Sequence, residues 1–154
     1  MNSTERFGSL ASRGALAAIF IISGFGKLAG PAGTAAYIAS HGLPLPMLAA
    51  IGAGILELAG GVMLLVGLRA RVAALVLATF LVPVTAIFHN PAGLTGMDAQ
   101  MQVIQLLKNL AIAGGLLSIA IWGAGQLSFD GLPFKRRRQA ERLSTAGPRD
   151  AVAS

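Results

Sequence analysis

The sequence predicts an all-α integral membrane protein, a bundle of four helices that span the bilayer. Of its 154 residues, 55% are hydrophobic and only 12% are charged, and the mean hydropathy is +0.71. A soluble domain would carry about 25% charged residues. Apolar stretches long enough to cross a hydrocarbon core of about 30 Å alternate with short segments rich in Gly, Pro or Arg. We expect one transmembrane domain, residues 1–131, with spans at about 9–28, 47–68, 72–90 and 101–123.

The first span carries a cation near each end of one helical face. That face consists of Arg13, Ala17, Phe20, Gly24 and Lys27. One interpretation is that both cations extend to the lipid headgroups. The alternative is that they point into the bundle. Arg13 then lies near the inner surface, where we expect a structural ion pair with Asp130 of the segment that follows the last span.

The second span contains a single acid, Glu57, near its middle and no Lys, Arg or Asp. A carboxylate at this depth costs about 3 kcal/mol, so it needs a partner. We expect Lys108 of the fourth span to be that partner. Gly60 and Gly61 lie on the same helical face as Glu57. We expect them to have a structural role, because small residues allow a neighbouring helix to approach closely. An alternative is that the ion pair only sets the helix register.

Polar residues also occur in the third and fourth spans. The third contains Pro83 and ends at His89, and the loop before the second span includes a candidate interfacial helix at 34–40. The uncharged stretch 110–122 is too short to cross a membrane alone, so the fourth helix must include Lys108 and Asn109.

An even number of spans puts both termini on one side of the membrane. Arg6, Arg13, Arg69 and Arg71 fall on that side, whereas the loops on the other side are nearly free of Lys and Arg. The positive-inside rule then places both termini in the cytoplasm of a bacterial inner membrane. For residues 132–154 we expect a disordered, basic tail. Its cations should contact anionic lipid rather than nucleic acid. Its cations are Lys135, Arg136, Arg137, Arg138, Arg142 and Arg149.

With this topology, polar groups from all four spans reach similar depths in the outer half of the bundle. We expect one cavity there, in which Glu57 and His89 are catalytic and exchange protons. The expected ligand-binding residues are Lys27, Gln105, Lys108 and Asn109. The excess of cations over carboxylates predicts a net positive site. Such a site suits a quinone headgroup or a small anionic molecule.

The residue inventory limits the cofactors. The chain has no Cys and only two His, His41 in a loop and His89 at a helix end. We therefore expect no disulfide, no thiolate metal site and no bis-His haem. The expectation is no metal and no covalent cofactor, with a quinone as the candidate bound molecule.

These residues match a family. Over residues 6–130 the chain resembles the DoxX family of small four-span membrane proteins. The matching pieces, in order, are Arg13; Ser23, Gly24 and Lys27; Glu57, Gly60 and Gly61; Gly67, Leu68, Arg69, Ala70 and Arg71; His89; Leu107, Lys108 and Asn109; and Gly123, Gly125, Ser128 and Asp130. The resemblance implies the fold and the membrane location. Some relatives are the membrane part of a thiosulfate:quinone oxidoreductase, and others are associated with membrane complexes that handle oxidative or thiol stress.

Three functions remain open at this point. The first is a redox-linked protein that binds a quinone or a small polar or anionic molecule, as a subunit of a quinone-linked oxidoreductase. The second is a non-catalytic accessory or scaffold subunit of a membrane oxidoreductase complex, in which small-residue faces dock a membrane partner or a second copy. The third is a small-solute permease, for which four spans are few.

Overall fold

The computed structural model describes residues 3–132, which fold into helices. The elements are α1 (Ser3–Ala29), α2 (Pro31–Ser40), α3 (Pro46–Val66), α4 (Ala70–Phe88), α5 (Gly96–Trp122) and the short 3-10 helix η1 (Phe129–Gly131). Four of them, α1, α3, α4 and α5, are long and apolar enough to cross a membrane. The predicted all-α bundle of four membrane-spanning helices is therefore confirmed.

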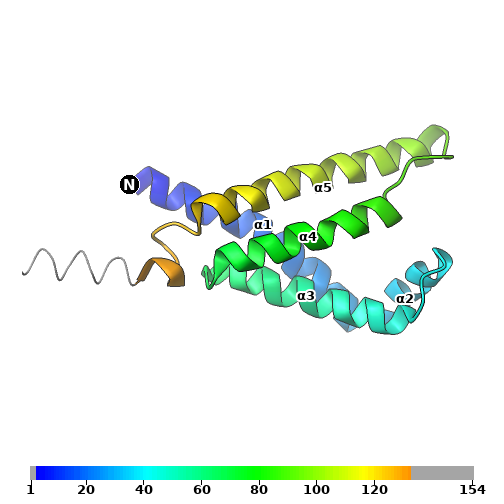
Figure 1. The fold of residues 1–154 in the computed structure, drawn as a ribbon, viewed down its shortest axis with the longest axis horizontal. Helices are drawn as coiled ribbons and strands as arrows, with labels where there is room; N and C mark the ends of the chain where they lie inside the picture. The colour runs from blue at the N-terminus through cyan, green and yellow to red at the C-terminus, as the bar shows by residue number, and fades with distance from the viewer. Residues whose placement is uncertain (1–2, 133–154) are drawn as a thin grey trace, which may run out of the picture.

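The four long helices pack as two pairs. α1 packs mainly on α3, α4 packs mainly on α5, and contacts between α3 and α4 join the pairs. Figure 1 shows the start of α1, the turn between α3 and α4, and η1 gathered at one end of the bundle, with α2 at the other. We call these the N-terminal end and the α2 end. Each end collects segments that are far apart in the sequence.

Two helices begin earlier than the predicted spans. α1 begins at Ser3 and α5 at Gly96, whereas the hydropathy pattern places the spans from about 9 and 101. Glu5 and Asp98 lie in the respective first turns, where a negative charge interacts favourably with the helix dipole. Hydropathy reports the apolar part of a helix, and a helix can continue beyond it through polar turns. The short helix expected at 34–40 is α2, which starts at Pro31.

Glycines bring α1 and α3 into close contact. A Cβ atom on Gly24 would lie 2.5 Å from the backbone nitrogen of Leu58 and 2.7 Å from the carbonyl oxygen of Gly54. On α3, a Cβ atom on Gly61 would lie 2.9 Å from Cγ1 of Ile21. Gly60 faces α4 instead, where a Cβ would lie 2.9 Å from Leu77. The small residues around Glu57 thus allow both neighbouring helices to approach α3.

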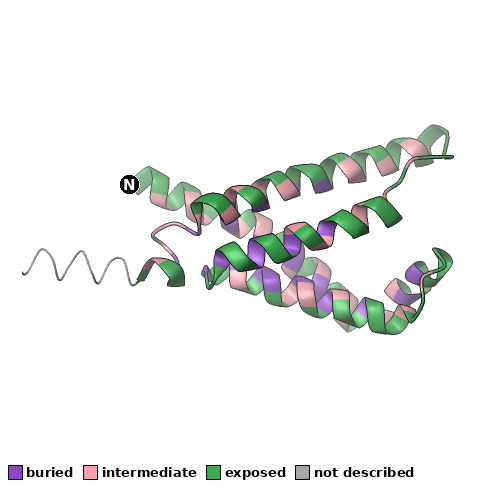
Figure 2. Cartoon of the chain, in the orientation of Figure 1, coloured by how far each residue is buried: buried purple, intermediate pink, exposed green. Residues whose placement is uncertain are grey.

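The interior is small and the outer surface is apolar. Phe20, Leu64, Leu77 and Leu116, one from each long helix, are almost fully buried. Large apolar side chains elsewhere, such as Ile22, point outward, and Figure 2 shows exposed residues along the outer sides of the helices. An apolar exterior of this extent suits lipid as the surrounding solvent.

Arg13 secures the N-terminal end in a way that differs from the predicted pair with Asp130. Its side chain is only 1% exposed, and its guanidinium donates to the carbonyl oxygens of Ala124, of Leu65 at 3.3 Å and of Leu127 at 2.7 Å. Backbone carbonyls at the end of α3 and after α5 carry partial negative charge that a cation can satisfy. Arg13 therefore attaches the segment after α5 to the bundle.

Asp130 has a different role from the one predicted. Its carboxylate accepts hydrogen bonds from the backbone N–H groups of Arg69 and Ala70, both at 2.8 Å. These N–H groups lie at the start of α4, where no residue before the helix provides a side-chain cap. Asp130 is near enough to interact with Arg13 through its charge, but within residues 3–132 the two form no hydrogen bond: Arg13 donates to backbone carbonyls, and the carboxylate caps α4.

The close approach of α1 and α3 gives a direct test. We expect Gly24→Ala to destabilise the protein by about 1–3 kcal/mol, because the added methyl group meets backbone atoms that cannot rotate away. Gly26→Ala is the matched control, since a Cβ there meets nothing within 4 Å. The free energy of unfolding in detergent micelles measures both. Equal stability of the two variants would contradict the packing described.

Candidate functional site

An ion pair links α1 to α3 inside the bundle. The Nζ atom of Lys27 lies 2.7 Å from Oε2 of Glu57, and the Glu57 side chain is only 9% exposed. Lys27 also donates to Oγ of Ser23, one helical turn earlier, at 2.6 Å. The partner of the buried acid Glu57 is thus a lysine of α1, the helix that packs most closely on α3. The predicted Glu57–Lys108 pair is wrong.

The local sequence explains why this pair forms. Ser23 and Lys27 are four residues apart and share a helix face, so the hydroxyl orients the ammonium group. Gly24 lies on the same side and lets α3 come close. On α3, a Cβ on Gly54 would lie 3.1 Å from Cβ of Lys27, so the lysine stem crosses α3 where that helix has no side chain.

A cavity of about 560 Å³ opens beside this pair at the α2 end, between α1, α2, α3 and α4. We call it the pair pocket. Its acidic and basic lining residues are Lys27, Glu57 and His89. Most other lining side chains are apolar: Ile38, Leu43, Ala49, Ala53, Phe80, Pro83, Val84, Ile87 and Phe88. The pocket therefore presents a buried charge pair to an apolar slot.

Aromatic rings gather at the α2 end of the pair pocket. The ring centroids of Tyr37 and His41 are 4.7 Å apart, and the ring of Phe88 lies 5.5 Å from Tyr37 and 4.9 Å from His41. Tyr37 and Phe88 line the pocket. His41 is exposed, and its Nδ1 lies 2.9 Å from the carbonyl oxygen of Tyr37. This cluster joins the end of α2 to α4, and two of its three rings belong to the pocket wall.

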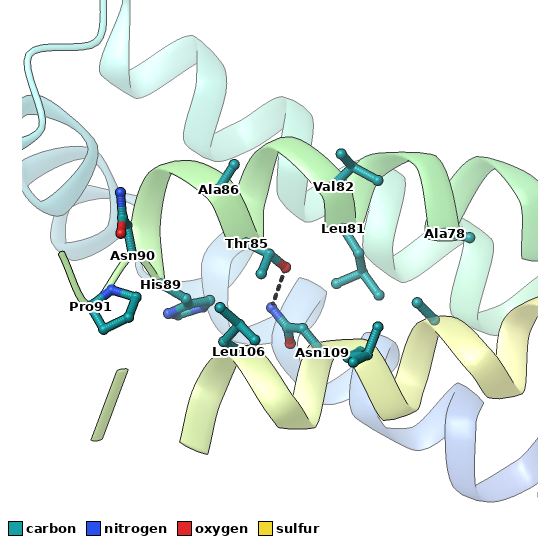
Figure 3. A pocket seen from close by; sticks show the side chains of 12 residues that line it. Ala78, Leu81, Val82, Thr85, Ala86, His89, Asn90, Pro91, Leu106 and Asn109 are labelled. Carbon is teal, nitrogen blue, oxygen red and sulfur yellow. Dashed lines mark hydrogen bonds between the residues drawn. The ribbon is translucent and has the colours of Figure 1, made fainter. Parts of the chain in front are cut away.

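A second cavity, of about 450 Å³, lies between α4 and α5. We call it the α4–α5 pocket, and Figure 3 shows its lining. Asn109 is buried there, and its Nδ2 donates to Oγ1 of Thr85 at 3.0 Å. The remaining lining is largely apolar. The single cavity expected from the sequence is therefore two pockets, one on each side of α4.

His89 is common to both pockets. It ends α4, and its Nδ1 lies 3.1 Å from Oε1 of Gln102 on α5. An amide oxygen only accepts hydrogen bonds, so in this arrangement Nδ1 of the neutral ring carries the proton. Nε2 is then the nitrogen that can accept a proton or a hydrogen bond.

The structure excludes Lys108 and Gln105 from both pockets. Lys108 is exposed on α5, while the adjacent Asn109 is 7% exposed and faces α4. Consecutive residues of a helix are separated by about 100°, so both side chains cannot point inward. Gln105 is half-buried but lines neither pocket. The rotation of α5 explains the position of Lys108, whereas Gln105 is on nearly the same face as Asn109 and lies outside the lining of both pockets.

The charge of the pair pocket differs from the expectation as well. Without Lys108, its acidic and basic side chains are one lysine, one glutamate and one histidine. The Lys27–Glu57 pair is neutral as a unit, so the expected net positive site is not present while His89 is neutral. Within residues 3–132, no group of three or more His, Cys, Asp or Glu side chains is placed to hold a metal ion.

Sequence reasoning did not assign roles to Ser23, Thr85 and Gln102, which orient Lys27, Asn109 and His89 respectively. The spacing of Ser23 and Lys27 is a signal that a search for hydrogen bonds between residues four apart would detect. The other two bonds join α4 to α5, and nothing local in the sequence predicts them. Tyr37 and Phe88 also meet only in three dimensions.

Comparisons with known proteins agree with the membrane fold. A family model described as DoxX matches residues 8–90. The chain is 38% identical to "Inner membrane protein YphA" of Escherichia coli (strain K12) over 79% of this chain and 86% of the relative, and 36% identical to "Inner membrane protein YqjF" of the same organism over 88% and 99%. It is 29% identical to "Putative oxidoreductase CatD" of Bacillus subtilis (strain 168) over 90% and 96%. No solved structure gives a significant match.

Replacing the lysine of the buried pair should be far more costly than replacing the exposed lysine. We expect Lys27→Met to destabilise the protein by about 3–5 kcal/mol, because it leaves a buried carboxylate without its cation. The double variant Lys27→Met/Glu57→Gln should recover part of this loss. Unfolding in detergent micelles provides the measurement.

Lys108→Met is the matched control, since it removes the same charge from an exposed position. We expect it to change stability by no more than about 0.5 kcal/mol. If Lys108→Met destabilised the protein as much as Lys27→Met, the assignment of the partner of Glu57 would be refuted.

Proposed function

This chain belongs to the DoxX family, and from that premise we propose that it is a redox-linked integral membrane protein whose pair pocket binds a quinone headgroup. The observation that carries the proposal is the buried Lys27–Glu57 pair at the wall of an apolar pocket of about 560 Å³. Pockets of this size hold small organic ligands, and a few polar groups orient them.

Lys27 can contact a ligand without giving up its partners. An ammonium group has three N–H donors. Two of them are directed at Ser23 and Glu57, so one is left for another acceptor. The Lys27 side chain is 23% exposed and lines the pocket. A quinone carbonyl oxygen would accept this hydrogen bond, which is strengthened by the positive charge of the donor.

The charge balance favours an uncharged carbonyl compound over an anion. Lys27 and Glu57 neutralise each other, and an added anion would be repelled by the carboxylate and would lose its hydration in an apolar slot. A quinone brings no charge, and its ring suits the aromatic and aliphatic lining, such as Phe80 and Phe88. Quinones are also soluble in the lipid that surrounds the bundle.

Glu57 and His89 are the proton-exchanging groups in this proposal. Conversion of a quinone to a quinol takes up two electrons and two protons. Glu57 shares a proton network with Lys27, and His89 can accept a proton at Nε2, so both can transfer protons at the pocket wall. The electrons come from a membrane partner subunit, because the chain has no cysteine and no metal-binding motif. The Bacillus subtilis relative named "Putative oxidoreductase CatD" supports the redox assignment.

A non-catalytic accessory or scaffold subunit of a membrane oxidoreductase complex is the second candidate. The observation that favours it is Lys108, an exposed cation about halfway along α5. A lysine facing hydrocarbon is costly unless it reaches the headgroups or meets a partner. In this second case a membrane protein covers α5 and pairs with Lys108.

We also propose that the chain resides in the bacterial inner membrane with both termini in the cytoplasm. The E. coli relatives carry "inner membrane" in their names. Arg6, Arg13, Arg69 and Arg71 lie at the N-terminal end, where η1 also lies in Figure 1. The loop between α4 and α5, at the opposite end, has no Lys or Arg. This asymmetry supports the cytoplasmic assignment.

Quinone binding can be tested by fluorescence. Trp122 is the only tryptophan; it ends α5 and is not among the residues that line the pair pocket. We therefore place a reporter in the pocket with Tyr37→Trp in a Trp122→Phe background. A short-chain quinone should quench it saturably, and adding Lys27→Met should weaken the apparent affinity about tenfold or more, since a hydrogen bond to a charged donor is lost.

Two controls separate binding from partition into the detergent. The wild-type chain reports through Trp122, where only unsaturable quenching is expected. Lys108→Met in the reporter background should leave the affinity unchanged. Quenching that rises linearly in the Tyr37→Trp reporter, as at Trp122, would count against a quinone site.

The absence of cysteine allows the orientation to be tested with single-cysteine variants. We expect Ala92→Cys, in the exposed loop before α5, to react with a membrane-impermeant maleimide on intact spheroplasts. Ser3→Cys, at the N-terminal end, should react only after the membrane is broken. The reverse labelling pattern would show the opposite topology.

A further inference from the structure

A crevice of two adjoining cavities lies at the N-terminal end, at the opposite end of the bundle from the pair pocket. The smaller cavity, about 190 Å³, lies between α1 and α5 and includes Arg13 and Ser118 in its lining. The larger, about 780 Å³, lies beside the α3–α4 turn and includes Arg69 and Arg71. Both are bordered by Trp122, Gly123 and Ala124, so the two cavities adjoin along this segment, and we call them together the crevice.

Arg13, which lines the smaller cavity, keeps one buried donor without a partner. The terminal nitrogens of its guanidinium are directed at three backbone carbonyls, but the buried Nε atom has no hydrogen-bond acceptor among residues 3–132. A buried N–H without an acceptor costs about 1–3 kcal/mol. The side chain lines the smaller cavity together with Ser9, Ser12 and Ser118. One buried cation and three serines thus line this space, and the hydroxyls of Ser9 and Ser12 donate to the carbonyl oxygens of Ala124 and Ser9.

The charges of the crevice favour an anion. Its cations are Arg13, Arg69 and Arg71, and its carboxylate is Asp130. Both oxygens of Asp130 already accept backbone N–H groups at the start of α4. Arg71 is exposed and lies against Gly123, where a Cβ would be 3.3 Å from its Nε, so its guanidinium is held beside the crevice.

We propose that this crevice binds the phosphate of an anionic phospholipid headgroup. Trp122 is 75% exposed at its edge, and tryptophan favours the headgroup region of a membrane. The outer face of α5, with Leu117 and Ile121 exposed, provides an apolar surface for the acyl chains. Basic pockets between membrane helices are suited to acidic headgroups by the same electrostatics. The site is separate from the pair pocket and does not depend on a redox function.

Native mass spectrometry tests the proposal. The purified full-length chain is exchanged into micelles that contain equal amounts of phosphatidylglycerol and phosphatidylcholine, and the retained lipids are counted. The wild type should retain phosphatidylglycerol preferentially. Arg71→Gln should reduce this preference about fivefold, the expected contribution of one cation near a lipid phosphate.

A second variant and a matched control complete the design. Arg13 itself supports the fold, so Ser118→Leu serves to fill the smaller cavity while leaving every cation in place, and it should also reduce the preference. Lys108→Gln removes an exposed cation that does not line the crevice and should retain the wild-type preference. Thermal unfolding checks that each variant is folded.

Three outcomes would overturn the proposal: equal retention of the two lipids by the wild type, an unchanged preference in both folded crevice variants, or a loss of preference in Lys108→Gln equal to that in Arg71→Gln. A further measurement with inorganic phosphate distinguishes a lipid headgroup from free phosphate as the ligand. If excess phosphate without lipid raised the melting temperature of the wild type as much as phosphatidylglycerol does, the site would bind free phosphate and the lipid assignment would be wrong.

Discussion

The ion pair between Lys27 and Glu57 is the interaction on which the rest of the structure depends. A carboxylate in the apolar interior is tolerated only beside a cation, and the pair requires α1 and α3 to lie almost backbone to backbone. Gly24 and Gly54 make that approach feasible by removing side chains from the contact. This one electrostatic requirement explains the close packing of α1 on α3, the position of the pair pocket and the orientation of Lys27.

Buried charges have different partners at the two ends of the bundle. At the α2 end, opposite charges neutralise each other and leave an apolar pocket that suits an uncharged ligand. At the N-terminal end, Arg13 is satisfied by backbone carbonyls, and Asp130 is occupied in capping α4. That end therefore keeps an excess of cations. An anion is better accommodated there than in the pocket where the sequence alone suggests it.

Several motif residues of the DoxX pattern acquire a physical meaning from these contacts. Ser23 orients the ammonium group, Gly24 admits α3, and Lys27 neutralises the acid. His89 joins α4 to α5 through Gln102 and borders a pocket on each side of α4. Because α4 separates the pockets, the polar residues of α5 belong to a different site from the ion pair. Lys108, a motif residue on α5, remains exposed and contributes to neither pocket.

The sequence by itself determined the helical spans, because hydropathy over a membrane-length window depends only on composition, and it determined that Glu57 needs a partner. It also indicated the depth of each polar residue, since depth follows from position along a span. Only the tertiary structure decided which cation pairs with Glu57 and that the polar residues occupy two pockets. Those outcomes depend on the rotation of each helix about its axis and on which helices are adjacent. Both are set by the packing of side chains from distant parts of the chain.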